Sequence, residues 1–111
     1  MPVKFFHEKK TRVNKSKALK QFIASIFNKE AKALDTLTYI FCSDSYLLNI
    51  NRQYLQHDFY TDIISFNLSD HPDSPVIGEI YISTERVKDN ASIHHTNFEQ
   101  ELHRVIFHGA L

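Results

Sequence analysis

The sequence predicts an α/β fold: a mixed four-stranded sheet with helices packed on it and a central C-terminal helix. Two observations lead to this prediction. Segments with apolar residues at every third or fourth position alternate with short β-branched and aromatic runs. The last two of these runs are joined by a short polar loop, which suits antiparallel strands, because a parallel crossover needs a dozen residues or more. We therefore expect parallel and antiparallel strand pairs in one sheet.

The composition is that of one ordinary globular domain. The chain has 111 residues, of which 42% are hydrophobic and 23% are charged, enough for one core and unlike a disordered protein. Its apolar runs are too short to cross a membrane, and the N-terminus lacks the apolar segment of a secretory signal. A single cysteine, Cys42, excludes an internal disulfide. We expect a single domain over residues 1–111, located in the cytoplasm.

The first half of the chain is expected to form strand, helix, strand and helix. The predicted elements are a strand at 3–6, an amphipathic helix at 16–33, a buried strand at 36–43 and a helix at 45–55. The first helix has one apolar stripe, made of Leu19, Phe22, Ile23, Ile26 and Phe27. Asp44 or Ser45 is expected to cap the second helix, because both side chains can accept from a free amide.

The second half is expected to add a hairpin and the closing helix. The predicted elements are strands at 61–68 and 76–83, a short helix at 84–90, a connection at 91–95 and a last helix. Thr96 and Glu99 have the spacing of a capping box at the start of that helix. The helix has Phe98, Leu102, Val105 and Ile106 on one face, and Phe107, Ala110 and Leu111 make its end apolar nearly all round. We therefore expect it to be buried.

The residues alone do not define a catalytic site. None of the seven histidines forms the i, i+4 helical pair that suits zinc, and Gly109 follows His108 where the HExxH motif has glutamate. His108 lies in an apolar segment and is either a hydrogen-bonded buried histidine or a metal ligand. Cys42 lies in a predicted strand without a CxxC partner, which favours a core role.

Charge is unevenly distributed along the chain. Residues 1–20 contain seven Lys or Arg and one Glu, a net charge of +6, and the remainder carries −6. Such a basic segment can lie against a phosphate backbone, or it can be a solvated loop and helix face. The sequence leaves both interpretations open.

Three segments resemble the YbeY family, bacterial metal-dependent endoribonucleases of ribosomal RNA maturation. Asp58–Phe66 matches the family pattern Asp-x-x-Thr-Asp-(Val/Ile)-(Leu/Ile)-Ser-Phe, and Gly78–Ser83 matches Gly-(Asp/Glu)-Ile-x-Ile-Ser. His108–Leu111 matches the first four positions of His-Gly-x-Leu-His-Leu-x-Gly-Tyr-Asp-His. The resemblance implies a mixed sheet with helices and one metal cleft.

In this family three histidines of the last motif hold the metal, usually taken as zinc. Three histidines leave the fourth zinc position open for a water whose pKa falls to about 7, so that it can attack a phosphodiester. The resemblance assigns His108 as the first ligand, and the motif would place the second at position 112. The chain is therefore expected to be C-terminally truncated within the motif, to bind zinc poorly and to be inactive alone.

The resemblance also implies residues that contact RNA. Thr61, Asp62 and Ser65 would form a cleft wall beside the metal, although Thr61 and Asp62 could equally satisfy local amides at a strand start. Many members have an arginine directly after the motif tyrosine, where this chain has Leu55 after Tyr54. Arg52 is close by in sequence and is the candidate to reach the same cleft.

The sequence thus leads to one principal hypothesis and two alternatives. The principal hypothesis is a single-strand-specific, zinc-dependent endoribonuclease that acts on ribosomal RNA or on the ribosome. The first alternative is a non-catalytic ribosome- or RNA-binding module, which the basic N-terminal segment and Leu55 favour. The second is a metal-dependent peptidase, which a cleft with a single metal ion would also allow.

Overall fold

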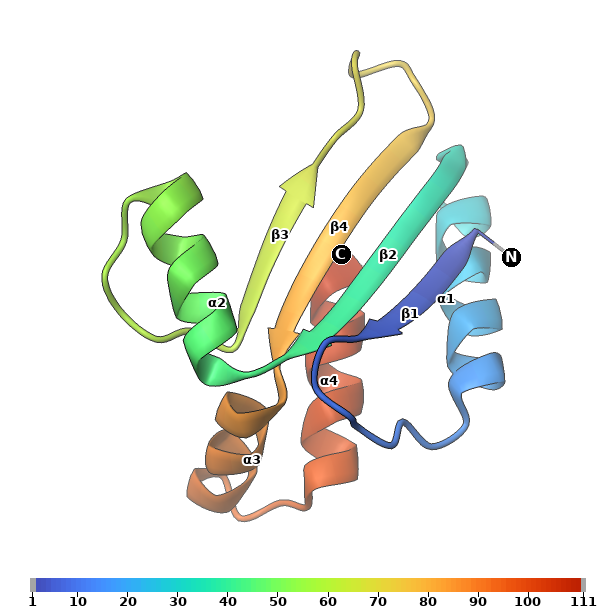
Figure 1. The fold of residues 1–111 in the computed structure, drawn as a ribbon. Coiled ribbons are helices and arrows are strands. Elements are labelled where there is room, and N and C mark those ends of the chain that lie inside the picture. Colours follow the sequence, from blue (N-terminus) through green and yellow to red (C-terminus); the bar gives the residue numbers. More distant parts are fainter. Residues whose placement is uncertain (1, 111) are drawn as a thin grey trace.

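In the computed structural model, which describes residues 2–110, the chain folds into a four-stranded mixed sheet with helices on both faces (Figure 1). The strands are β1 (Val3–His7), β2 (Leu34–Cys42), β3 (Ile63–Asn67) and β4 (Val76–Ser83). The helices are α1 (Ser16–Lys29), α2 (Asp44–Ile50), α3 (Thr84–Ile93) and α4 (Phe98–Ala110), and the π-helical turn η1 (Asn51–Leu55) continues α2. Among these residues no helix is long and apolar enough to span a membrane.

The strand order confirms the predicted mixed sheet. The strands lie in the order β1-β2-β4-β3, with β1, β2 and β4 parallel and β3 antiparallel to β4. The hairpin of β3 and β4 is the antiparallel pair expected from its short loop. Because β1, β2 and β4 run in one direction, their carboxyl ends meet at one edge of the sheet.

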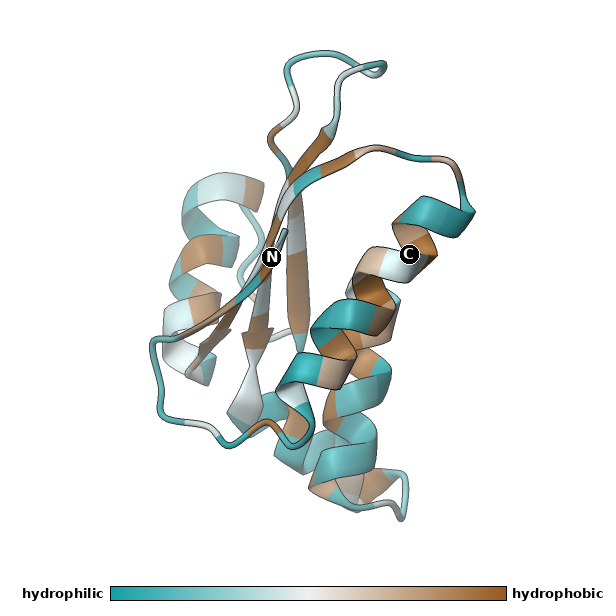
Figure 2. Ribbon diagram, turned by 90° about the vertical axis from the view of Figure 1, so that its right-hand side faces the viewer, coloured by the Kyte–Doolittle hydropathy of each residue, from teal (hydrophilic) through white to brown (hydrophobic). Residues whose placement is uncertain are grey.

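The two faces of the sheet are covered by different helices. Figure 2 shows α2 on one side of the sheet and α1 and α4 on the other. Alternate residues of β2 divide accordingly, since Tyr39 and Phe41 belong to the core under α1 and α4, while Cys42 packs with Leu47 and Ile64 under α2. A side chain on α4 and one on η1 are therefore separated by the sheet.

The helix α4 packs against the sheet through one face only. Val105 and Ile106 are fully buried, and the hydroxyl of Tyr39 donates to the carbonyl of Ile106 at 2.8 Å. Burial raises the pKa of that hydroxyl, which keeps it protonated as a donor. His108 is exposed and Phe107 is half-buried, so the prediction of a helix end buried all round is wrong for the described residues. Leu111, named in that prediction, lies outside them.

The α1 stripe is narrower than expected. Leu19, Ile23 and Phe27 are buried, but Phe22 is 55% exposed and contacts Phe107 edge to face, with ring centroids 5.4 Å apart. Phe22 belongs to the predicted stripe but is not covered by the sheet. Its only aromatic contact among the described residues is with Phe107 of the neighbouring helix α4.

Two predicted helix caps are wrong by one residue. Ser43, and not Asp44 or Ser45, caps α2, because its hydroxyl accepts from the backbone amide of Tyr46 at 3.1 Å. The cap of α4 is Asn97, whose Oδ1 accepts from the amide of Gln100 at 2.8 Å. The capping box predicted from Thr96 and Glu99 does not form: the hydroxyl of Thr96 bonds the side chain of Gln100, and Glu99 accepts from Asn14.

Candidate functional site

The carboxyl-terminal part of α4 approaches the sheet closely at Gly109. A Cβ atom on Gly109 would lie 2.9 Å from Cδ1 of Ile63 and 3.0 Å from Cγ2 of Ile80, closer than side chains normally approach. The absence of a side chain therefore lets α4 lie against β3 and β4. His108, the residue before Gly109 in the helix, is exposed.

Three of the predicted site residues lie on or just before β3. Asp62 is half-buried, and its carboxylate accepts from the side-chain amide of Asn90 at 3.4 Å. The hydroxyl of Thr61 donates to the carbonyl of Ile63 at 3.4 Å, a local contact with a carbonyl and not with an amide. Ser65 is exposed and lies two residues after Ile63, so it shares the sheet face on which α4 packs.

Arg52, the fourth candidate, lies on the other side of the sheet. It belongs to η1, where its Nε pairs with the carboxylate of Asp58, and both side chains are largely exposed. The next-but-one residue of η1, Tyr54, packs against Phe66 with ring centroids 6.0 Å apart, on the face that α2 covers. The structure therefore does not bring Arg52 together with His108.

The sequence did not single out Arg104, which shares a helix face with His108. The two residues are four positions apart on α4, a spacing that places side chains on the same side and that could have revealed Arg104. Arg104 donates through Nε and Nη2 to both carboxylate oxygens of Glu101, at 2.7 and 2.9 Å. This paired hydrogen bond, with a smaller contribution from Asp62, raises the pKa of Arg104 and fixes its cation near β3.

Glu101 was also missed, because its position in an amphipathic helix looks like a surface site. Its side chain is 2% exposed. The hydrogen bonds from Arg104 lower its pKa, with a further contribution from His94, whose Nδ1 lies 3.7 Å from Oε2. The carboxylate is therefore charged and positions Arg104 on the exposed face of α4.

These residues do not by themselves form a metal centre. No group of three His, Cys, Asp or Glu that could hold a metal ion occurs within residues 2–110. A zinc site needs three or four such ligands around one point. Of the donors that the family motif requires, this part of the chain provides His108 alone.

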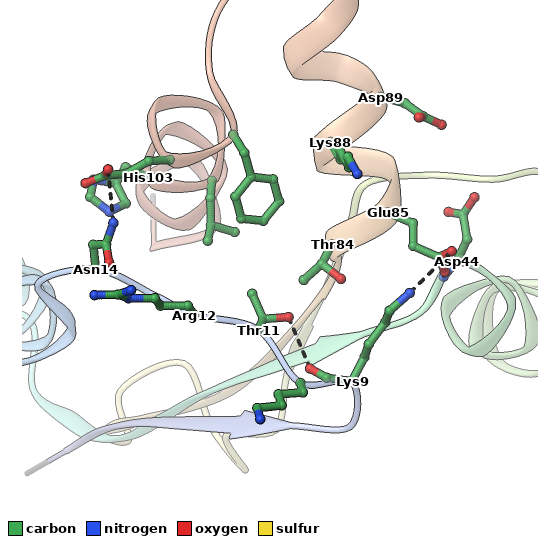
Figure 3. A pocket seen from close by; sticks show the side chains of 14 residues that line it. Lys9, Thr11, Arg12, Asn14, Asp44, Thr84, Glu85, Lys88, Asp89 and His103 are labelled. Atoms are coloured by element: carbon green, nitrogen blue, oxygen red, sulfur yellow. Dashed lines mark hydrogen bonds and ion pairs between the residues drawn. The ribbon is translucent and has the colours of Figure 1, made fainter.

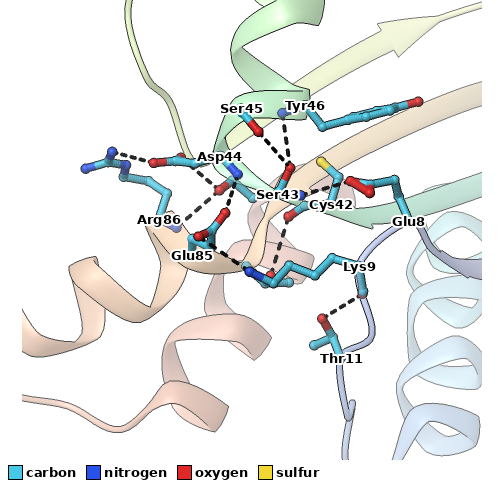
Figure 4. A network of polar contacts seen from close by, with 12 residues as sticks. Glu8, Lys9, Thr11, Cys42, Ser43, Asp44, Ser45, Tyr46, Glu85 and Arg86 are labelled. Carbon is cyan, nitrogen blue, oxygen red and sulfur yellow. Dashed lines mark hydrogen bonds and ion pairs between the residues drawn. The ribbon is translucent and has the colours of Figure 1, made fainter.

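A second polar region lies at the carboxyl ends of β1, β2 and β4 (Figure 4). Asp44 accepts from Arg86 at 2.7 Å and from the hydroxyl of Ser83 at 2.9 Å, and its backbone amide donates to Glu85 at 2.8 Å. Glu85, whose pKa is lowered mainly by that amide, also pairs with Lys9 at 3.4 Å. These contacts tie the segments that follow the three parallel strands to one another.

Cys42 lies beneath this network and has no exposed surface. Burial, together with the charges of Glu8 and Asp44, raises the pKa of its thiol to about 12. A thiol that stays protonated at neutral pH is a poor nucleophile. The predicted core role of Cys42 is confirmed.

Beside the network, a groove of about 820 Å³ opens between the β1–α1 loop, α3 and the first half of α4 (Figure 3). The loop contributes Lys9, Lys10, Thr11, Arg12 and Asn14. Lys88 of α3 and Phe98, Leu102 and His103 of α4 line other parts of the wall. The groove thus contains much of the basic segment that the sequence singled out.

Comparison with known proteins places the chain in a family. The family described as "Endoribonuclease YbeY" matches residues 4–111. An endoribonuclease YbeY of Cytophaga hutchinsonii is 47% identical over 93 residues, which are 84% of this chain and 64% of that protein. The corresponding protein of Parabacteroides distasonis is 43% identical over 97 residues, or 87% of this chain and 67% of that protein. The chain therefore spans about two thirds of the length of these relatives.

The fold has a counterpart among solved structures. The solution structure of TM1509 from Thermotoga maritima superposes with a TM-score of 0.60 and 25% sequence identity, over 96% of this chain and 68% of that one. The family match covers all three motifs on which the resemblance depended, since it extends from residue 4 to residue 111. The chain belongs to the YbeY family of endoribonucleases.

Proposed function

We propose that the protein is a zinc-dependent endoribonuclease that cleaves single-stranded RNA during ribosomal RNA maturation in the cytoplasm. One observation supports this proposal above the others: Gly109 places α4 against Ile63. Two family motifs that are more than forty residues apart in the sequence, Asp58–Phe66 and the one that begins at His108, thereby meet where Gly109 contacts Ile63.

His108 is assigned one coordination bond to the zinc ion. The other ligands are assigned to the histidines that the family motif places after Leu111. The exposed position of His108 near the end of α4 supports this assignment, because a ligand must be free to meet donors from another segment.

The residues around His108 are assigned to the RNA. Arg104 is the group best suited to a phosphate, since its guanidinium is always charged and Glu101 fixes its orientation. Hydroxyl and carboxylate groups for a ribose or a base come from the residues on or just before β3, which are Thr61, Asp62 and Ser65. Arg104 would thus supply the positive charge that Leu55 does not.

An extended chain tests the proposal. The segment that follows the His-Gly motif in the Cytophaga hutchinsonii relative would be fused after Leu111, and zinc content and cleavage of single-stranded RNA would be measured. We expect about one zinc per extended chain and zinc-dependent cleavage, whereas the 111-residue chain is expected to bind zinc weakly and to be inactive. His108→Ala should weaken zinc binding by more than the roughly 10–100-fold typical for loss of a residue that supports a ligand.

His71→Ala provides the matched control, because His71 lies in the exposed loop between β3 and β4. It should leave zinc content and RNA cleavage unchanged. An extended chain without bound divalent metal, or a His108→Ala variant with full zinc content and cleavage, would contradict the proposal. Metal-dependent cleavage of peptides without cleavage of RNA would support the peptidase alternative instead.

A further inference from the structure

The groove at the carboxyl edge of the sheet is open, yet most of its carboxylates are already engaged. Asp44 and Asp89 both pair with Arg86, at 2.7 and 3.7 Å. Glu85 pairs with Lys9, and Glu99 accepts from the side chain of Asn14 at 3.1 Å. Three of these carboxylates thus pair with a cation, Asp44 and Asp89 with the same arginine, and Glu99 bonds a neutral amide.

Three cations of the groove, in contrast, have no ion-pair partner among the described residues. Lys10, Arg12 and Lys88 are exposed, and none of them forms an ion pair with another residue of the 2–110 range. Figure 3 shows that Arg12 and Lys88 come from different walls, the β1–α1 loop and α3. A chain of negative charges that follows the groove would therefore meet free positive charges on both sides.

The wall contributed by α4 is suited to a flat, partly apolar group. Phe98 is half-buried, so part of its ring faces the groove, while Leu102, one turn further along the helix, is buried in the core beneath the wall. The Nε2 atom of His103 is shielded from solvent and has no hydrogen-bond partner among the described residues.

We propose that this groove binds a segment of single-stranded RNA, with phosphates on Lys10, Arg12 and Lys88 and a base against the ring of Phe98. Aromatic contact with a base and charge contact with phosphates are the two components of single-strand binding by proteins. The inference rests on the proposed function, because it takes RNA as the substrate class.

The groove is a separate site and not part of the surface around His108. His103 and His108 are five residues apart on α4, which corresponds to about 7.5 Å along the helix and about 140° around it. A substrate held in the groove would therefore be anchored away from the position assigned to cleavage. The groove would select and retain the strand, and it would not act on the scissile bond.

A charge-reversal experiment on the 111-residue chain tests the inference. Binding of a fluorescent single-stranded RNA oligonucleotide would be measured by polarisation for Lys10→Glu/Arg12→Glu/Lys88→Glu. The matched control, Lys17→Glu/Lys29→Glu/Lys32→Glu, makes the same change in net charge at exposed positions on and after α1. We expect the groove variant to bind at least tenfold more weakly than the control variant at equal salt concentration.

Salt dependence provides a second readout. For single strands the slope of log K against log salt is about −0.7 per phosphate contact. The groove variant should therefore lose roughly two units of slope relative to the original chain, and the control variant should lose much less.

In addition, RNA should shift the amide resonances of Lys10, Arg12 and His103 and leave those of Lys17 and Lys29 in place. Inorganic phosphate alone should reproduce only the shifts in the β1–α1 loop.

Equal weakening by the two triple variants would overturn the inference, because it would reduce the effect to net charge. Absence of RNA binding by the original chain would overturn it as well.

Failure of the groove inference can be distinguished from failure of the proposed function. If the groove variant keeps full affinity while His108→Ala abolishes cleavage by the extended chain, the groove inference fails and the endoribonuclease proposal stands. The reverse result would leave the groove as an RNA-binding site without that activity.

Discussion

At the scale of single residues, the buried carboxylate of Glu101 is the feature that most distinguishes α4 from an ordinary surface helix. An ionised group that is 2% exposed is costly unless it is paired, and here Arg104 donates to both of its oxygens. Arg104 itself is 56% exposed, so solvent screens part of the attraction. Glu101 therefore stabilises the helix and at the same time fixes a cation near His108.

Glu101→Gln should lower the free energy of unfolding at pH 7 by about 1–2 kcal/mol, because the charged acceptor is lost while its shape is kept. The pKa of Glu101 is lowered in the folded protein, so its contribution is present above the ordinary value of 4.5 and is lost as the pH falls through the folded pKa. The difference in the free energy of unfolding between the variant and the original chain should thus become smaller at acid pH. Urea denaturation at pH 7 and below pH 4 measures both effects.

Glu30→Gln, at an exposed position, is the control and should change stability by less than about 0.5 kcal/mol at either pH. A difference between Glu101→Gln and the original chain that stays constant from neutral to acid pH would show that the effect is not due to the charge.

At the scale of secondary-structure elements, two helix ends explain why the predicted boundaries were wrong. α1 was expected to continue to residue 33 but ends at Lys29, where Ala31 has a φ of 54° and the amide of Lys32 returns to the carbonyl of Phe27 at 2.9 Å. α3 ends in the same way with His95, whose φ is 55°. Glycine normally occupies this left-handed position and signals it in a sequence. Neither glycine of this chain has a positive φ, so the signal was absent.

Ala31→Gly should increase the free energy of unfolding by about 0.5–1 kcal/mol. The left-handed conformation costs a residue with a side chain about 1–2 kcal/mol, and the greater flexibility of glycine in the unfolded chain offsets part of the gain. Ala18→Gly, at an exposed position inside α1, should instead decrease stability by about 1 kcal/mol. Thermal unfolding of the two variants gives the comparison. A decrease of similar size in both would show that Ala31 is not strained.

Periodicity and composition were sufficient for the element types and for the hairpin, since these depend on local patterns. The helix ends were not predictable, because backbone geometry decides them. The same distinction applies to the site. The motifs made His108, Thr61, Asp62 and Ser65 candidates, but only the fold shows that Arg52 belongs to η1, which continues the helix on the sheet face opposite α4. Glu101 and Arg104 were missed because an ion pair within a helix resembles ordinary surface charge until the burial of one partner is known.

At the scale of the whole molecule, the end of α4 connects the proposed metal to the stability of the fold. Val105 and Ile106 pack in the main core, Tyr39 bonds the carbonyl of Ile106, and Gly109 lies against β3 and β4. A zinc ion held by His108 and by ligands from a following segment would link that segment to this buried helix. Zinc that binds only the folded state adds its binding free energy to the stability of the protein.

The extended chain should therefore be stabilised by zinc, and the 111-residue chain should not. With zinc at one hundred times its dissociation constant the gain is about 2.7 kcal/mol, which corresponds to a rise of roughly 10 °C in the melting temperature of a protein of this size. Thermal unfolding in zinc and in a chelator measures the shift for both chains. His108→Ala in the extended chain should remove most of the shift, and His71→Ala should preserve it. An equal shift in the extended chain and in its His108→Ala variant would exclude His108 as the link between the metal and the fold.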